Sequence, residues 1–193
     1  AATATKAAIY LIVRFVFDVF PDGQFGEVFL RWILAPLAAA AVIIGSLQAI
    51  FAKEVRRILA FSSVAQVGFI LLGVSLATAA GISAGVYYLI AHALLKGALF
   101  MAVGAFAMSV QARTVDDFAG IAREAPWSAV AFGVGAASLA GVPMTMGFLA
   151  KWALIAAALE SGAVWIAVTL AIGSLLTLIY VGRMMEAIFF RAP

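Results

Sequence analysis

The sequence contains no cysteine and few charged residues. Of its 193 residues, 12 are Lys or Arg, 9 are Asp or Glu and one is His. Without cysteine, this chain has no thiolate metal site. Only 11% of the residues are charged and 66% are hydrophobic, whereas about a quarter of a typical soluble domain is charged. The mean hydropathy of +1.17 therefore indicates a protein whose solvent is lipid.

The apolar residues form continuous runs. A backbone in lipid must satisfy its own polar groups, as a helix or a closed barrel. Barrel strands alternate apolar and polar residues over about ten positions, but these runs reach about 20 residues, the length of a spanning helix. We therefore predict an all-α integral membrane protein of about six transmembrane helices in a single membrane domain, residues 1–193. The expected helices cover residues 3–20, 30–52, 58–78, 83–110, 127–159 and 163–190.

The basic residues gather on one predicted side of the membrane. The side reached after the second, fourth and sixth helices carries seven of them, Lys53, Arg56, Arg57, Arg113, Arg123, Arg183 and Arg191, and the other side carries Arg14 and Arg31. Because cytoplasmic loops are enriched in Lys and Arg, we expect the loops 53–57 and 111–126 and the C-terminus in the cytoplasm. The net charge of +3 then reflects loop charge and indicates no nucleic-acid partner. We expect 111–126 to form a short interfacial helix or a plain loop.

Three lysines, Lys6, Lys96 and Lys151, fall inside apolar runs, while all nine carboxylates lie in loops or at helix ends. A lysine at bilayer depth costs at least about 2.5–3.5 kcal/mol. A long side chain near a helix end can instead reach the interface, which is the alternative for Lys6 and, less easily, for Lys151. Lys96 is in the middle of its helix, so its charge predicts a role in a proton or cation pathway.

Polar residues accompany Lys96. His92 precedes it by four residues and Tyr88 by eight, so the three share one helix face. His titrates near neutral pH, and such a stripe can pass protons through intervening water. A second polar patch, Ser62, Ser63 and Gln66, either supports the pathway or makes ordinary interhelical hydrogen bonds.

The expected helix 127–159 contains a break, marked by Gly141, Pro143 and Gly147. Proline removes one backbone hydrogen bond and clashes with the preceding turn. Broken helices near the bilayer midplane are typical of ion sites in transporters, and Lys151 follows the break by two turns. The alternative is a proline kink that serves packing alone.

Four segments carry a family resemblance: TKAAIYLIVRF (5–15), RRILAFSSVAQVGFILLG (56–73), HALLKGALF (92–100) and SLAGVPMTMGFLAKW (138–152). They resemble, in order, the antiporter-like membrane subunits of Mrp cation/proton antiporters and of respiratory complex I. The resemblance implies the second half of an inverted-repeat antiporter-like fold, roughly the eighth to thirteenth of fourteen core helices. We therefore expect this chain to be a piece of a longer membrane protein.

The resemblance also implies roles for individual residues. Lys6 matches the lysine that links the two half-channels, His92 and Lys96 match the central pair, and Lys151 matches the terminal ionisable residue on the broken helix. The family's upstream glutamate and lysine would precede residue 1. No cofactor and no metal ligand set are implied.

The implied function is proton translocation in a multisubunit antiporter that exchanges Na⁺ or K⁺ for H⁺. The form Gly-Phe-Leu-Ala-Lys, ending at Lys151, resembles the D-type Mrp subunit and some quinone-reductase subunits, and we favour the D-type Mrp assignment. The alternative is a proton-pumping subunit of NADH-quinone oxidoreductase (complex I) or of a membrane hydrogenase. A third hypothesis, a structural scaffold with vestigial lysines, conflicts with the cost of unused buried charge.

The expected partners are other membrane subunits of the same complex, the lipid bilayer and the transported ions. The expected location is the bacterial plasma (inner) membrane.

Overall fold

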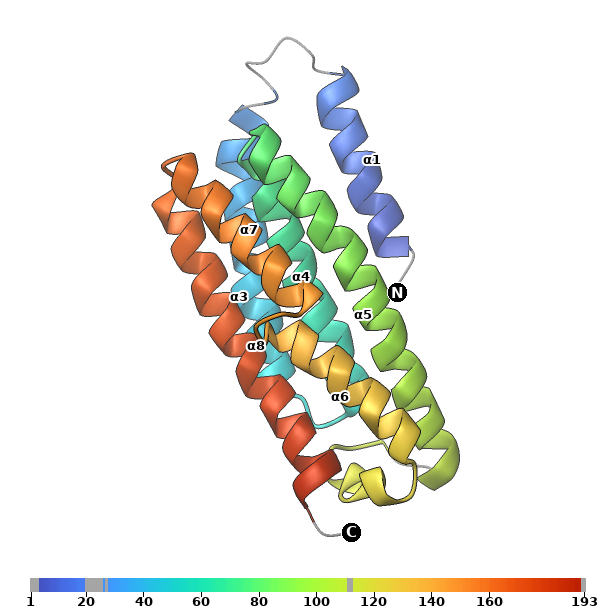
Figure 1. Ribbon diagram of the computed structural model, residues 1–193. Helices are drawn as coiled ribbons and strands as arrows, with labels where there is room; N and C mark the ends of the chain where they lie inside the picture. The colour runs from blue at the N-terminus through green and yellow to red at the C-terminus, as the bar shows by residue number, and fades with distance from the viewer. Residues whose placement is uncertain (1–3, 20–25, 27, 111–112, 192–193) are drawn as a thin grey trace.

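The computed structural model describes residues 4–19, 26, 28–110 and 113–191, which form a helical bundle (Figure 1). The elements are α1 (Ala4–Val19), the π-helical segment η1 (Phe29–Leu34), α3 (Ala35–Phe51), α4 (Val55–Ser75), α5 (Ala79–Val110), the 3₁₀ turns η2 (Asp116–Phe118) and η3 (Ile121–Arg123), α6 (Pro126–Ala140), α7 (Met146–Glu160) and α8 (Val164–Phe190). Within these ranges the only β-type pairing is an isolated bridge between Glu54 and Thr114. The prediction of an all-α fold is confirmed.

Among the described residues, four helical segments are long and apolar enough to cross a bilayer: 29–51, 55–75, 79–108 and 164–190. The second of these, α4, is the central helix. In its most apolar stretch 67% of the residues are buried inside the bundle, against 39% in each of the other three helices. Glycines allow α3 to approach α4 closely. A Cβ atom on Gly68 would lie 2.6 Å from the carbonyl oxygen of Ala38, so a larger residue would push the two helices apart. Small residues commonly create such close contacts between membrane helices.

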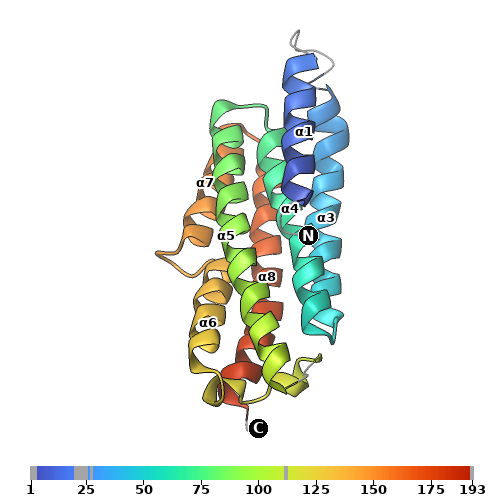
Figure 2. The same ribbon diagram turned by 90° about the vertical axis from the view of Figure 1, so that its right-hand side faces the viewer.

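The predicted broken helix is present as α6 and α7, which follow one another along the bundle (Figures 1 and 2). Helix α6 ends at Ala140, three residues before Pro143, and Gly141 takes a left-handed conformation with φ +90°. Thr145 then caps α7, because its side-chain oxygen accepts a hydrogen bond from the backbone N–H of Phe148. The chain therefore leaves one helix and starts another within five residues.

One end of the bundle is closed by the segment between α5 and α6. The backbone N–H of Val55 donates to the carbonyl of Arg113 at 3.1 Å, and Val115 donates to Lys53 at 3.0 Å. From residue 113 onward this segment forms the two 3₁₀ turns in place of the interfacial helix that was one of the two expectations. Helix α4 begins at Val55, so Arg56 and Arg57, expected in a charged turn, belong to its first turn.

Helix α1 lies along the side of the bundle (Figures 1 and 2). Ile9 is buried in the apolar cluster that α3, α4, α5, α7 and α8 form, while Tyr10, Leu11 and Phe15 are exposed. This exposed apolar surface suits lipid or another apolar partner. The backbone of Lys6 belongs to α1, but its side chain lies outside the described part of the structure.

Candidate functional site

Lys96 is buried in the middle of α5, with 1% of its surface exposed. Its Nζ donates a hydrogen bond to the carbonyl oxygen of Leu59 at 2.8 Å and another to Oγ of Ser62. Ser62 and Ser63 each donate to the same Leu59 carbonyl at 2.9 Å. Both serines of the predicted polar patch therefore meet at the carbonyl that holds Lys96, although only Ser62 contacts the ammonium.

Gln66, one turn further along α4, connects three helices. Its Oε1 accepts a hydrogen bond from the hydroxyl of Tyr88 on α5. Its Nε2 donates to the hydroxyl of Tyr180 at 3.2 Å and to Oγ1 of Thr177 at 3.4 Å, both on α8. All four side chains are buried. The result is a fixed polar cluster in the bundle interior, in which each group has a hydrogen-bonding partner.

His92 lies on the same face of α5 as Tyr88 and Lys96 and is 2% exposed. Its ring centroid is 6.5 Å from that of Tyr88. The imidazole carries both a donor and an acceptor in its neutral form. It therefore stands between a buried hydroxyl and a buried ammonium, in the order that the spacing in the sequence predicted.

Lys151 is 5% exposed and occupies the break between α6 and α7. Its Nζ donates to the carbonyl oxygen of Leu139 at 2.9 Å and to that of Ala140 at 3.3 Å. The last carbonyls of a helix have no partner within the helix, so the break presents two acceptors and the ammonium fills them. Lys151 is thus held by backbone atoms that a continuous helix would have used itself.

The break is fixed by a tight contact between α6 and α7. The backbone N–H of Gly147 donates to Oγ of Ser138 at 3.1 Å. A Cβ atom on Gly147 would lie 1.8 Å from the carbonyl oxygen of Ser138, a separation that only glycine permits. Gly147 therefore sets how closely the first turn of α7 approaches the last turn of α6, and with it the position of Lys151.

Phe69 on α4 contacts both parts of the site. The Nζ of Lys151 lies 5.5 Å from its ring centroid, in cation–π range, and the ring is 5.8 Å from that of Tyr88. A phenyl ring neither donates nor accepts a proton. The Lys151 part and the Tyr88–His92–Lys96 part therefore approach each other across an apolar side chain.

Four contributors to the site were not predicted: Phe69, Ser138, Thr177 and Tyr180. Thr177 and Tyr180 did carry a signal, because they are three residues apart in a mostly apolar helix and so share one face. Phe69 and Ser138 carried none, since a phenylalanine and a serine in a membrane helix are ordinary packing residues.

Charged groups at the end of the bundle near the C-terminus tie loops to helices. Arg191 forms ion pairs with Asp116 at 2.6 Å and with Glu186 at 3.3 Å. The hydrogen bond from Arg191 to Glu186 and the negative charge of that carboxylate raise the pKa of Arg191. Arg183 on α8 donates to the carbonyl of Ile50 at 2.6 Å and to that of Ala52. Its guanidinium therefore satisfies the carbonyl end of α3.

Comparison with known proteins gives consistent matches. The family described as NADH:quinone oxidoreductase/Mrp antiporter, transmembrane, matches residues 1–177. Subunit N of the NADH-quinone oxidoreductase of Desulforudis audaxviator is 36% identical over 191 residues, which cover 99% of this chain and 38% of that protein. Subunit N of the F420H2 dehydrogenase of Methanosarcina mazei is 30% identical, over 90% of this chain and 36% of that protein.

Solved structures show the same fold. A chain of the Mrp complex from Dietzia sp. is 38% identical with a TM-score of 0.87, covering 97% of this chain and 34% of that chain. A chain of the archaeal membrane-bound sulfane sulfur reductase is 30% identical with a TM-score of 0.89, covering 96% and 38% respectively. This chain is an integral membrane protein, and it spans 38% of the first of the curated relatives.

Proposed function

Because this chain belongs to the NADH:quinone oxidoreductase/Mrp antiporter transmembrane family, we propose that it is the part of a multisubunit antiporter that conducts protons. In this proposal the complete protein exchanges Na⁺ or K⁺ for H⁺. The proton pathway runs through Lys6, His92, Lys96 and Lys151, and no cofactor takes part. The family membership confirms the resemblance inferred from the four sequence segments, and the roles of the residues rest on their surroundings in the bundle.

The observation that carries the proposal is the environment of the two buried lysines. Lys96 donates to a carbonyl and a hydroxyl, and Lys151 donates to two carbonyls. These acceptors are neutral dipoles, which orient the ammonium groups through hydrogen bonds. A buried charge held in this way is costly in lipid and responds to charges that arrive nearby. Such a group is suited to losing and regaining a proton.

Ser62, Ser63, Gln66 and Tyr88 support the pathway in this proposal. The hydroxyls of Ser62 and Tyr88 can each donate and accept, and both lie beside groups that titrate. Gln66 keeps the two tyrosines in place. The hinge residues Gly141, Pro143 and Gly147 maintain the break at which Lys151 is held.

A second candidate function is supported by the curated relatives, which are named as subunit N of NADH-quinone oxidoreductases. In that case the same relay serves a proton-pumping subunit of complex I or a related membrane hydrogenase, and electron transfer in partner subunits drives it. Under either function the partners are other membrane subunits of one complex, and the chain contributes a single membrane domain, residues 1–193, to a longer protein.

We also propose an orientation in the bacterial plasma (inner) membrane. The loops at 53–57 and 111–126 and the C-terminus would face the cytoplasm, because the basic residues gather at that end. Arg183 supports this orientation less than the other basic residues do, since its guanidinium donates hydrogen bonds to the end of α3.

The test uses the full-length protein in its complex, in inverted membrane vesicles with a pH-sensitive dye. Lys96→Ala and Lys151→Ala should each reduce proton movement at least about tenfold, since positioned proton-transfer groups typically contribute a factor of about 100 or more. Arg56→Ala, which removes an exposed charge at the end of the bundle, is the matched control and should keep normal rates. Normal rates in both lysine variants, at normal protein levels, would contradict the proposal.

The same vesicles distinguish the two candidate functions. An antiporter relieves an imposed pH gradient when Na⁺ or K⁺ is added, without any electron donor. A respiratory complex produces a gradient only when NADH or another electron donor is oxidised. Cation-induced relief that persists in membranes with inhibited electron transfer favours the antiporter, and its absence together with donor-driven pumping favours the respiratory complex.

A further inference from the structure

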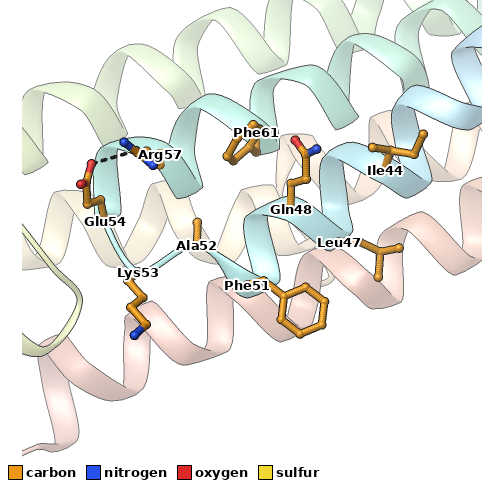
Figure 3. A pocket seen from close by; sticks show the side chains of 9 residues that line it. All are labelled: Ile44, Leu47, Gln48, Phe51, Ala52, Lys53, Glu54, Arg57 and Phe61. Atoms are coloured by element: carbon orange, nitrogen blue, oxygen red, sulfur yellow. Dashed lines mark ion pairs between the residues drawn. The ribbon is translucent and has the colours of Figure 1, made fainter.

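A pocket of about 630 Å³ lies at the turn between α3 and α4 (Figure 3). It is outside the buried lysine site and open to the side of the bundle. One part of its lining is apolar and comes from Ile44, Leu47, Phe51 and Phe61; the other part is polar and comes from Gln48, Lys53, Glu54 and Arg57. The volume is within the range of about 300–1,000 Å³ that is usual for ligand pockets.

The apolar part of the pocket is exposed on the surface of the bundle. Ile44, Leu47 and Phe51 are 55%, 41% and 79% exposed on the outer surface of α3. They are spaced three and four residues apart, so they form one stripe along the helix. Figure 3 shows Leu47 and Phe51 following one another along α3 toward the turn. An acyl chain lying parallel to the helix would cover this stripe.

The polar part carries a net positive charge. Lys53 and Arg57 contribute two positive charges and Glu54 one negative charge. Glu54 pairs with Nε of Arg57 at 3.1 Å, which leaves the terminal nitrogens of the guanidinium for another acceptor. The carbonyl end of α3, which would repel an anion, is occupied by the guanidinium of Arg183. An anion at the turn therefore meets Lys53 and Arg57, while Glu54 is paired with Arg57 and two carbonyls at this end of α3 are bonded to Arg183.

Gln48 connects the two parts. It is exposed, lines the same pocket and lies five residues before Lys53, about one turn deeper in the membrane. A carboxamide on the lipid-facing side of a helix is costly unless it finds a polar partner. The ester carbonyls of a phospholipid lie just below its phosphate, at the depth where Gln48 stands relative to the two cations.

We propose that this pocket binds one anionic phospholipid. The phosphate lies at Lys53 and Arg57, the ester region at Gln48, and an acyl chain on Ile44, Leu47 and Phe51. Basic pockets beside transmembrane helices are suited to anionic headgroups, and the charge of the rim together with the apolar stripe selects a lipid over a free phosphate ion. The pocket is separate from the proton pathway, because none of these residues belongs to it.

The test is native mass spectrometry of the intact complex, delipidated and then titrated with phosphatidylglycerol or with zwitterionic phosphatidylethanolamine. The wild-type complex should retain phosphatidylglycerol preferentially. The double variant Lys53→Gln/Arg57→Gln should weaken its binding about fivefold for each charge removed. The matched control Arg56→Gln/Arg123→Gln removes two exposed charges from the same end of the bundle but none from the pocket, and should bind as the wild type does.

Three results would overturn the proposal. Equal weakening by the two double variants would mean diffuse attraction to a basic surface. Equal binding of the two phospholipids by the wild-type complex would show that the charges of Lys53 and Arg57 do not select an anionic headgroup. Shielding of the thiol in a Gln48→Cys variant from lipid-soluble reagents, combined with its cross-linking to another subunit, would mean that a protein covers this face. Normal proton movement in the pocket variants is expected and separates this test from that of the proposed function.

Discussion

The Nζ of Lys96 on α5 lies 2.8 Å from the carbonyl oxygen of Leu59 on α4, 37 residues earlier in the chain. Ser62 and Ser63 also donate their hydroxyls to the same carbonyl and make that part of α4 polar. The central helix of the bundle thus carries the polar face, and the charged side chain on its neighbour reaches across to it. The two serines should nevertheless differ in importance.

Ser62→Ala should disturb the site more than Ser63→Ala. The Ser62 hydroxyl accepts a hydrogen bond from Lys96, while the Ser63 hydroxyl bonds only to the backbone of its own helix. We expect Ser62→Ala to slow proton movement severalfold and to lower the free energy of unfolding by about 1.5–3 kcal/mol, the usual value for a hydrogen bond to a charged group. Vesicle assays and unfolding in mixed micelles would measure both. Equal effects of the two substitutions would argue against a contact between Ser62 and the ammonium.

Gln66→Leu should destabilise the bundle. The substitution removes the hydrogen-bonding partner shared by the buried hydroxyls of Tyr88 and Tyr180, and an unsatisfied buried polar group costs about 1–3 kcal/mol. Thr169→Val is the control, since the Thr169 hydroxyl is exposed and bonds within α8. Its effect should stay within about 0.5 kcal/mol. Thermal unfolding of the full-length protein in detergent, followed by tryptophan fluorescence, is the measurement.

Gly147→Ala should disrupt the break between α6 and α7. The new methyl group would lie 1.8 Å from the Ser138 carbonyl oxygen, so the two helices must separate, at a cost of about 1–3 kcal/mol or more. Proton movement should fall as well, because Lys151 depends on the carbonyls at that position. Gly97→Ala on α5 is the matched control, as a Cβ there meets nothing within 4 Å. The idea fails if the two variants unfold at the same temperature.

We expect the stability of the segment that closes the end of the bundle to depend on pH through the carboxylate of Asp117. The backbone N–H groups of Thr114 and Arg113 donate to its carboxylate at 2.8 and 3.0 Å, which lowers its pKa below the ordinary 3.8. Because the folded pKa is the lower one, these bonds stabilise the segment fully above pH 3.8 and lose their effect as the pH falls through the folded value.

Hydrogen exchange of the segment from residue 113 to residue 118 measures this effect. After correction for intrinsic rates, protection should drop in acid in the wild-type protein. Asp117→Asn should show weaker protection and no such drop, since the amide does not ionise. Glu124→Gln, an exposed residue nearby, should keep the wild-type profile. A drop that persists in Asp117→Asn would assign it to another group.

Much of the fold could be predicted from the sequence because lipid restricts the choices. Continuous apolar runs require helices, and Pro143 between Gly141 and Gly147 requires an interruption, which the structure has from Gly141 to Thr145. The interior position of Lys96 followed from its distance from either end of its helix, and that of Lys151 from its place inside an apolar run two turns after the predicted break. These features depend on local properties of the chain and not on which helices are neighbours.

The partners of the buried groups were not predictable in the same way. Gln66 bonds to Thr177, 111 residues later, and no local pattern indicates which helix faces α4. The acceptors for Lys151 are main-chain oxygens, which have no signature in the sequence. The same holds for Phe69, whose importance comes only from its position between Lys151 and Tyr88. The segment from residue 113 formed short 3₁₀ turns, and its backbone bonds at residues 113, 115 and 120 go to Val55, Lys53 and Ala187, which are far from it in the sequence.

The anchoring of Lys151 by backbone oxygens has a genetic consequence. A partner that is a side chain can be exchanged by a single codon change, but Leu139 and Ala140 keep their carbonyls whatever residue replaces them. Substitutions at these two positions should therefore spare the lysine, provided that they fit the packing. Second-site changes that rescue or abolish its role should cluster instead at Gly141, Pro143 and Gly147, where the residue type determines the backbone conformation of the break.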